Sequence, residues 1–492
     1  MDDQSPEPPT APMPSPDAAG VGEEVRQHYA ITLAVLAVAA LAYALLQTMV
    51  VPALPEIQRQ LHSSTTSVTW VLTVYLLAAS IATPVLGRLG DMFGKERVLV
   101  CVLLAFAAGC AMSALSHSLP LLVTGRAVQG AGGAVFPLAF GIIRDEFPAE
   151  RVATGIGLIS AVFGVGGGAG LLLSGLIVDH LSYEWIFWFG LLAALLAATA
   201  AHLFVPESPV KTPGQIDWTG TALLSGGLVC LLLAISEGPR WGWHSGRIVG
   251  LFLTAAAVLW IWAVVEGRIR DPLVDMTVLR LRGVWTTNLA GLLIGFGMFG
   301  SFVLIPGFVQ TPSAAGYGFG ATATGAGLFL LPSAAVMLIA GPLAGALGTR
   351  AGSRLPLQIG AVVATGAFVL LAAAHTAHWH IYLASLLLGA GIGFSFAAMA
   401  NLIVEAVPQT HTGQATGINS IARTIGGAFG AQIAATLVSS HLDRTTHLPA
   451  EVGYTNAFVM SAIGVSIAFL AALAIPGRTN EAVKSFRVNE PR

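Results

Sequence analysis

Charged residues are scarce in this sequence, because only 10% of its 492 residues are Asp, Glu, Lys or Arg. A soluble globular domain carries about 25%, so the composition excludes a soluble protein. The hydrophobic residues make up 55% of the chain and gather in fourteen stretches. Each stretch has the roughly 20 residues that an α-helix needs to cross a bilayer. The sequence therefore predicts an all-α polytopic membrane protein.

Cysteine and the common catalytic motifs are also scarce or absent. The three cysteines all fall within apolar stretches, where they resemble small hydrophobic residues and exclude a disulfide framework: Cys101, Cys110 and Cys230. Three histidines cluster in a short loop without carboxylates, so we expect no metal site there: His375, His378 and His380. No P-loop, nucleophile elbow or metal-binding helix motif occurs. We therefore expect neither an enzyme nor an ATP-driven pump, and no cofactor or nucleic-acid partner.

The placement of basic residues predicts the orientation of the spans. We predict spans at residues 30–52, 68–88, 98–115, 119–141, 155–178, 185–205, 218–236, 247–266, 286–310, 322–345, 356–375, 380–404, 417–440 and 453–475. Seventeen of the 23 Lys and Arg residues lie in the tails or after even-numbered spans, four lie in the other loops, and two lie within spans. Cytoplasmic loops are enriched in Lys and Arg, so we expect a multi-pass plasma-membrane protein with both termini in the cytoplasm.

An internal repeat predicts two related halves. The segment PVLGRLGDMFGKERVL resembles PLAGALGTRAGSRLPL, which lies 258 residues further along the chain. Two shorter matches, GAG and ATGI, follow in the same order at slightly larger offsets. Duplicated halves with a site between them are common in transporters, although glycine-rich helices can also match by chance. The predicted domains are a disordered tail (1–28), an N-terminal six-helix half (29–206), two inserted helices (207–283), a C-terminal six-helix half (284–476) and a second tail (477–492).

The segment GRLGDMFGKER at residues 87–97 matches the signature G-x-x-x-D-x-x-G-[RK]-x-[RK] of the major facilitator superfamily. With WVLTVYLL at 70–77, GRAVQGAGGA at 125–134 and the paired halves, the chain resembles the fourteen-helix drug:proton antiporter branch from about residue 30 to 476. The resemblance implies the major-facilitator fold, two six-helix halves plus two inserted helices. It also implies export of amphipathic compounds in exchange for protons, by alternating access.

The signature loop predicts a gate between the halves. Gly87 and Gly94 permit close approach and a tight turn, and Asp91 can cap the N-terminus of a helix. The resemblance implies that this Asp latches onto the start of the thirteenth span, near 412–415. The two basic residues of the loop, Lys95 and Arg97, could join a charge network with the next loop on the same side or could merely set topology. That next loop contributes Arg144, Asp145 and Glu146.

Arg126 is the most informative single residue, because an ionised side chain within a span is expensive and normally faces a cavity or a partner. Its helical face continues through Gln129, Gly130, Gly133 and Pro137, and we expect this face to line the central pathway. We expect Arg126 to pair with Gln47, which lies at similar depth in the first span. The resemblance places this Arg in the proton-coupling machinery, whereas the alternative is an Arg that snorkels to the headgroups.

The first span departs from the family pattern. Aligning LQTMVVPALP with D-x-T-[IV]-V-x-x-A-L-P places Leu46 where the family usually has an acid. No carboxylate lies mid-span, and only Arg126 and Arg423 carry charge at depth. This pattern favours neutral or anionic amphiphiles over lipophilic cations and leaves the proton carrier unidentified.

The fifth predicted span contains eight glycines between residues 155 and 175. Gly164, Gly168 and Gly170 have the spacing of close helix packing. The antiporter signature of the family usually has a Gly-Pro pair in this span, but here Leu171 follows Gly170, so the signature is only partly present. We expect the glycines to pack against the thirteenth span, near GGAFG at 426–430, and to permit bending during gating. Generic small-residue packing is the alternative.

These observations lead to one main hypothesis and two others. The main one is a monomeric secondary exporter of amphipathic small molecules, such as drugs, antibiotics or secondary metabolites, driven by protons. A uniporter or lipid flippase of the same fold, uncoupled from protons, would explain the missing acid. A membrane enzyme or sensor is disfavoured, because no acid or histidine cluster lies at depth.

Overall fold

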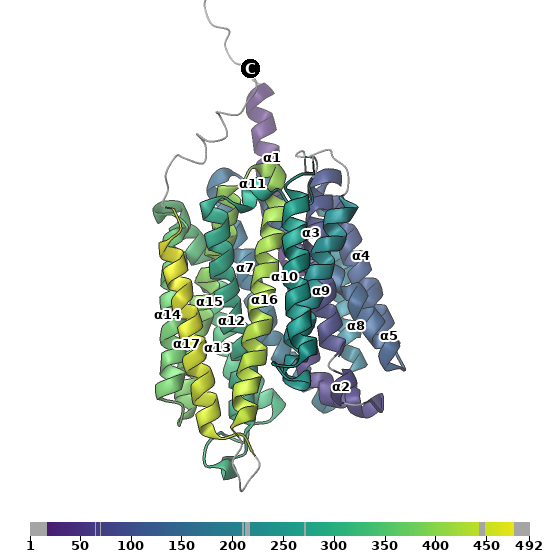
Figure 1. Ribbon diagram of the computed structural model, residues 1–492. Helices are drawn as coiled ribbons and strands as arrows, with labels where there is room; N and C mark the ends of the chain where they lie inside the picture. Colours follow the sequence, from purple (N-terminus) through teal and green to yellow (C-terminus); the bar gives the residue numbers. More distant parts are fainter. Residues whose placement is uncertain are drawn as a thin grey trace, which may run out of the picture.

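The computed structural model describes residues 17–63, 65–68, 70–208, 211, 217–269, 272–441 and 448–476. Within these ranges the regular elements are all helices, which run side by side as a bundle (Figure 1). The elements are α1 (Asp17–Gln60), α2 (Thr65–Val68), α3 (Trp70–Phe93), α4 (Lys95–Ala114), α5 (Leu119–Gln129), η1 (Gly130–Ala134), α6 (Val135–Glu146), α7 (Ala149–His180), α8 (Glu184–Phe204), α9 (Trp218–Trp241), α10 (Gly246–Glu266), α11 (Met276–Leu279), α12 (Arg282–Gln310), η2 (Ser313–Ala315), α13 (Ala323–Ala351), α14 (Arg354–Ala373), α15 (His378–Ala406), η3 (Gln409–His411), α16 (Thr412–Ser440) and α17 (Glu451–Leu473).

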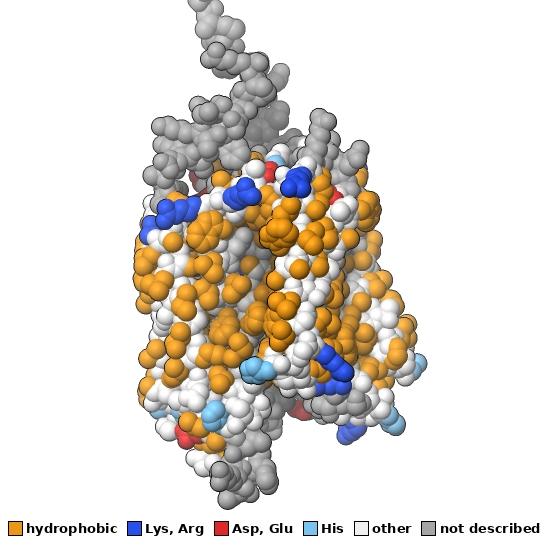
Figure 2. Space-filling view, viewed as in Figure 1, with side chains coloured by type: hydrophobic (Ala, Val, Ile, Leu, Met, Phe, Trp, Pro, Cys, Tyr) orange, Lys and Arg blue, Asp and Glu red, His pale blue; other side chains and the backbone are white. Residues whose placement is uncertain are grey.

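The predicted fourteen spans are confirmed. Fourteen helical segments of the described chain are long and apolar enough to cross a bilayer, so this is an integral membrane protein. The fourth span is built from α5, η1 and α6, because the glycine-rich sequence GAGGA forms a 3₁₀ turn between two α-helices. Figure 2 shows an orange, apolar flank, with several Lys and Arg side chains at the end from which α1 emerges. We call this end, where the signature loop lies, the basic end.

The first helix begins earlier than the sequence analysis predicts. α1 starts at Asp17, directly after Pro16, whereas residues 1–28 were expected to form a disordered tail. Residues 17–28 contain no proline and include Ala, Glu, Arg and Gln, which are good helix formers, so they can extend the helix of the first span. The prediction of disorder is therefore wrong for residues 17–28. Residues 1–16 and the predicted tail at 477–492 lie outside the described residues.

Buried apolar side chains form two large clusters. One is built from α1 to α8, with Ala400 and Val404 of α15 added to it, and the other from α12 to α17, with Leu171 of α7 added. A smaller third cluster joins α9 and α10 to Ile421 of α16. The hairpin of α9 and α10 therefore packs beside both large clusters, and the exact domain boundaries remain a prediction.

The two repeated loops have matching backbone geometry. Gly94 and Gly352, 258 residues apart, both have positive φ angles, 114° and 85°, which L-residues with side chains rarely adopt. A Cβ on Gly87 would lie 2.8 Å from the carbonyl oxygen of Gly413, and one on Gly345 would lie 2.4 Å from that of Ala153. In each half, a glycine of the repeated loop thus lets α3 or α13 touch the backbone of a helix from the other half.

Candidate transport site

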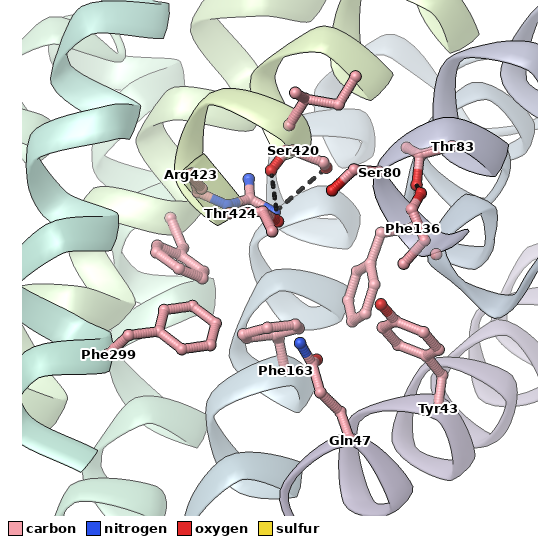
Figure 3. Close-up of a pocket in the computed structure, with 14 residues that line it drawn as sticks. Tyr43, Gln47, Ser80, Thr83, Phe136, Phe163, Phe299, Ser420, Arg423 and Thr424 are labelled. Carbon is pink, nitrogen blue, oxygen red and sulfur yellow. Dashed lines mark hydrogen bonds between the residues drawn. The ribbon is translucent and has the colours of Figure 1, made fainter. Parts of the chain in front are cut away.

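A cavity lies in the middle of the bundle, between the two large clusters (Figure 3). Fourteen described residues line it, contributed by α1, α3, η1, α6, α7, α12, α15 and α16: Tyr43, Gln47, Ala79, Ser80, Thr83, Gly133, Phe136, Phe163, Phe299, Phe396, Ser420, Ile421, Arg423 and Thr424. About 40 Å³ is open to the centre of a water molecule, which leaves room for only a few waters. A drug-sized molecule therefore needs the walls to move apart.

Arg423 is the one charged residue among the described lining residues. It donates hydrogen bonds to Asn419 Oδ1 and Ser420 Oγ, both at 3.2 Å, and its Cζ lies 4.6 Å from the ring centroid of Phe396. The helix α16 supplies both polar partners one turn before the arginine, at i−4 and i−3. These groups hold the guanidinium at the cavity wall without neutralising it, so it presents a positive charge to the cavity (Figure 3).

The rest of the lining combines aromatic rings with neutral polar groups. Phe136 and Phe163 meet edge to face, with ring centroids 5.2 Å apart, and Phe163 lies 5.6 Å from Phe396 across the two clusters. Gln47 lines the cavity, and its Oε1 is buried without a hydrogen-bond partner in the described chain. Such walls suit an amphipathic molecule with an aromatic or aliphatic body and a polar group.

Arg126 is completely buried behind the cavity wall. Its Nη1 donates to Gln129 Oε1 at 2.6 Å, its Nε donates to the carbonyl oxygen of Val71 at 3.2 Å, and its Cζ lies 3.9 Å from the ring centroid of Tyr75. The expected pairing with Gln47 is therefore wrong. Packing of α5 against α3 and α4 turns the guanidinium toward α3, whereas Gln47 faces the cavity.

The arginine still connects to the cavity through aromatic rings. The ring of Tyr75 lies 6.2 Å from that of Tyr43, which lines the cavity. Gln129, in turn, donates to Gly109 O at 3.0 Å and Ser113 Oγ at 2.9 Å on α4.

Only part of the face that carries Arg126 lines the pathway. Gly133 borders the cavity, but Gly130 packs against α3, where a Cβ would lie 2.4 Å from that of Ala78. The contact of Arg126 with Tyr75, and of Tyr75 with Tyr43, could not be predicted, because no spacing along the sequence links Tyr43 and Tyr75 to the fourth span.

The signature loop forms the predicted contact with the thirteenth span. Asp91 Oδ2 accepts a hydrogen bond from the backbone N–H of Gln414 at 3.3 Å, in the first turn of α16. Lys95 Nζ lies 2.6 Å from Asp145 Oδ2 and 3.6 Å from Asp91 Oδ1, and all three charged side chains are buried. We call Asp91, Lys95, Asp145 and Gln414 the latch. The structure thus confirms the network for Lys95.

The second basic residue of the loop behaves differently. Arg97 lies outside the latch, and its Nε contacts Glu207 Oε2 at 2.9 Å near the surface. The expectation that Arg97 joins the network of the next loop is wrong, because its position on α4 points away from α6.

Comparison with known proteins agrees with this architecture. Residues 36–431 match the model of the Major Facilitator Superfamily. The chain belongs to this superfamily. It is 32% identical over 448 residues to an uncharacterised MFS-type transporter of Mycobacterium tuberculosis (strain H37Rv), covering 89% of this chain and 64% of that protein. It is 28% identical over 420 residues to the tetracenomycin C resistance and export protein of Streptomyces glaucescens, covering 84% of this chain and 76% of that one.

A solved structure shows the same fold. The human organic anion transporter MFSD10 superposes with a TM-score of 0.65 at 16% identity, covering 90% of this chain and 99% of that one. The chain spans 64% of the length of its mycobacterial relative.

The glycines of the fifth span do not contact the helix that the sequence analysis predicts. A Cβ on Gly164 would lie 1.7 Å from Met337 Sδ, and one on Gly168 would lie 2.7 Å from Ala334 Cβ, both on α13. Gly170 instead faces α1, where a Cβ would lie 2.1 Å from Thr48 Oγ1. The predicted partner, the thirteenth span, is wrong: the tenth span, α13, and the first, α1, take its place.

The glycines of α16 have a different partner. A Cβ on Gly426 would lie 1.8 Å from the carbonyl oxygen of Leu292, and one on Gly430 would lie 2.0 Å from that of Phe296, both on α12. Each glycine-rich surface therefore has its own complementary helix, which spacing along one sequence does not reveal.

Arg144 joins the two clusters at the basic end. Its guanidinium donates to Thr412 Oγ1 at 2.7 Å and to the carbonyl oxygens of Val407 at 2.7 Å and Pro408 at 3.2 Å. Arg144 was predicted to join a charge network, but these bonds to the segment between α15 and η3 and to the start of α16 were not predicted, since nothing local to residue 144 indicates them.

Proposed function

We propose that this chain is a secondary active exporter that moves neutral or anionic amphipathic compounds out of the cell in exchange for protons. The observation that carries the proposal is the lining of the cavity, which combines aromatic rings and one guanidinium and, among its fourteen described residues, contains no carboxylate. A hydrophobic body gains from burial against the rings, and an anionic group gains from the Arg423 guanidinium. The antibiotic export named for the Streptomyces relative supports this class of function.

The closed state of the basic end supports a mechanism of alternating access. The latch and the bonds of Arg144 hold this end shut. We propose that it faces the cytoplasm of a plasma-membrane protein with both termini inside, because Lys and Arg are concentrated there. Substrate from the cytoplasm would then enter only after these contacts break. The functional unit in this proposal is the monomer, since one chain builds the whole cavity.

Arg126, Gln129 and the Tyr75–Tyr43 pair are the proposed coupling elements. The arginine is buried, hydrogen-bonded and one ring removed from the wall of the cavity. Movement of Tyr43 on substrate binding would reach the guanidinium through Tyr75. The proposed close-packing points for gating are Gly87 and Gly94 at the basic end, Gly130 in the middle of the fourth span, and Gly164, Gly168 and Gly170 of α7.

A specific observation favours a second candidate, a uniporter or lipid flippase uncoupled from protons. Leu46, at the position where related antiporters usually carry an acid, packs against α8: its Cδ1 would lie 3.0 Å from a Cβ on Gly190. Position 46 thus faces away from the cavity, and the cavity has no carboxyl group of its own to bind a proton.

The decisive experiment uses everted membrane vesicles with a respiration-driven pH gradient, in which a pH-sensitive dye reports proton release. We expect anionic and neutral amphiphiles to release protons only in vesicles that contain this protein. Movement of the compounds without proton release would support the uniporter or flippase, and a preference for lipophilic cations would contradict the proposed substrate class.

Arg423→Gln tests the role of the guanidinium. Hydrogen bonds to a charged group contribute about 1.5–3 kcal/mol, so half-saturation for anionic compounds should rise roughly 10- to 150-fold, while neutral compounds change little. Arg350→Gln, on the exposed last turn of α13, is the matched control and should transport normally. An equal loss for both charge classes would show that Arg423 serves the fold and not substrate recognition.

A further inference from the structure

Two carboxyl groups face each other at the basic end of the inserted hairpin. Asp217 precedes α9, and its Oδ1 accepts the backbone N–H of Gly220 at 2.8 Å. Glu266 ends α10, and its Oε1 accepts the backbone N–H of Val274 at 2.6 Å. The second oxygens, Asp217 Oδ2 and Glu266 Oε2, are both buried and have no hydrogen-bond partner in the described chain.

The two unpartnered oxygens converge on one place. A Cβ on Gly220 would lie 2.1 Å from Asp217 Oδ2 and 2.2 Å from Glu266 Oε2, so only a residue without a side chain leaves room for both. Glu266 is 1% exposed. Water therefore does not solvate its free oxygen, and a buried acceptor without a donor costs about 1–3 kcal/mol.

No cation in the described chain forms an ion pair with either carboxyl group. Titratable or charged side chains of the neighbouring elements include Asp275 before α11, His411 of η3 and Arg88 of α3. His411 Nε2 lies 3.8 Å from Asp275 Oδ2. The charge of Arg88 interacts electrostatically with His411 and with Asp91 of the latch. The described basic residues that flank the hairpin in sequence are exposed: Lys211 and Arg268.

We propose that Asp217 and Glu266 form a proton-binding site in which one proton bridges Oδ2 and Oε2. Two carboxylates that share a buried site cannot both ionise without strong repulsion. A proton taken from water onto one of them supplies the donor that both oxygens lack, and the other carboxylate accepts its hydrogen bond. The bound proton belongs to the pair and not to either residue.

The proton site is connected to the latch through two hydrogen bonds. The residue after Val274, Asp275, donates its backbone N–H to Gln414 Oε1 at 3.1 Å, and the backbone N–H of Gln414 donates to Asp91 Oδ2 at 3.3 Å. Loss of the proton leaves two facing negative charges, which push the end of α10 away from α9. The loop at 273–275 and its support of Gln414 then loosen, so proton binding favours the closed basic end.

The first test measures the proton and needs no substrate. Infrared spectroscopy of the full-length protein in lipid detects the C=O stretch of a protonated carboxyl group as the pH is raised. We expect a band that persists at pH values where ordinary Asp and Glu, with pKa values of about 4, are ionised. Glu266→Gln and Asp217→Asn should each remove the same band. Glu405→Gln, a change at an exposed carboxyl group, should retain it.

Both test variants keep the size of the side chain and can donate a hydrogen bond to the remaining carboxylate, so they should fold. Absence of the band in the unmodified protein, or its survival in either variant, overturns the proposal. The result is independent of transport, so it distinguishes a wrong proton site from a wrong exporter assignment.

The second test measures the connection to the latch. Hydrogen exchange at the amides of Val274 and Asp275, corrected for the intrinsic effect of pH, should become several-fold faster at pH values where the band disappears. In Glu266→Gln this extra acceleration should be lost, because the amide cannot ionise. Exchange that accelerates equally in the variant contradicts the connection. The proton site itself does not depend on the proposed exporter function. Only its consequence, that cytoplasmic pH sets how readily the basic end opens, rests on that function.

Discussion

The two places where the halves meet at the basic end have the same backbone geometry and different chemistry. Between α3 and α16, Gly87 approaches Gly413 and a buried set of charges surrounds the contact. Between α13 and α7, Gly345 approaches Ala153 in the same way. Here the residues 258 positions after Asp91 and Lys95 are Thr349 and Ser353, which are neutral.

In the contact between α13 and α7, which we call the neutral contact, hydroxyl groups take the positions of the charged groups. Thr349 Oγ1 donates to Ala346 O within its own helix at 2.7 Å, and Ser353 Oγ donates to Glu405 Oε1 at 2.6 Å. Asn401 Nδ2 donates to Ala153 O at 3.2 Å across the halves.

The helices of the neutral contact also touch along more of their length. The glycine contacts of α7 with α13 run from Gly157 and Gly341 near the basic end to Gly175 and Thr324 at the opposite end. We infer that α7 and α13 form the pivot, held by shape, while α3 and α16 form a gate held by charges that can separate.

Lys95→Met should give the largest loss of stability. It leaves Asp91 and Asp145 buried without their cation, and breaking a buried pair costs about 3–5 kcal/mol. Unfolding in detergent mixtures measures the loss. The matched change in the other half, Ser353→Ala, removes one hydrogen bond to a carboxylate and should cost about 1.5–3 kcal/mol. Equal losses would show that the two contacts are not chemically different.

Arg144→Gln should weaken the closed gate by about 1.5–3 kcal/mol, the range for hydrogen bonds to a charged group. The three bonds that it loses join α6 to the short segment between α15 and η3 and to the first residue of α16, so the effect should fall on opening more than on unfolding. Faster hydrogen exchange at the backbone amide of Gln414, which donates to Asp91 in the closed gate, would measure opening. An unchanged exchange rate would remove Arg144 from the gate.

Gly157→Ala should destabilise the pivot by about 1–3 kcal/mol, the usual range for overpacking. The added Cβ would lie 2.4 Å from the carbonyl oxygen of Gly341, and backbone atoms cannot move aside as a side chain can. Gly366→Ala, where nothing lies within 4 Å, is the control and should stabilise α14 slightly. Thermal unfolding of both variants checks the prediction, and a stable Gly157→Ala protein would contradict a tight pivot.

Arg97→Ala should cause the smallest loss of stability, below about 1 kcal/mol. Its ion pair with Glu207 lies near the surface, and exposed ion pairs contribute little. The variant should retain transport and thermal stability. A loss as large as that of Lys95→Met would mean that both basic residues of the signature loop serve the latch.

Several features of the fold and site could be predicted because they are local. Fourteen spans follow from hydropathy, and the bond between Asp91 and the start of α16 was implied by the family resemblance of the signature loop. Arg423 was predicted to carry charge at depth, and it lines a cavity whose described residues include no carboxylate. In contrast, the start of α1 was misjudged, because the composition of residues 1–28 was averaged over a proline-rich part and a helix-forming part.

Hydropathy and the internal repeat are enough to predict fourteen spans and two related halves, because both are properties of contiguous residues, and the family resemblance of the signature loop implies the latch. The three-dimensional packing was needed to show that Arg126 meets Tyr75 and not Gln47, that α7 packs on α13 and α1, and that Leu46 faces α8. These outcomes depend on how far each helix rotates about its axis. That rotation is set by small-residue surfaces on helices distant in the chain, whose complementarity no single segment contains.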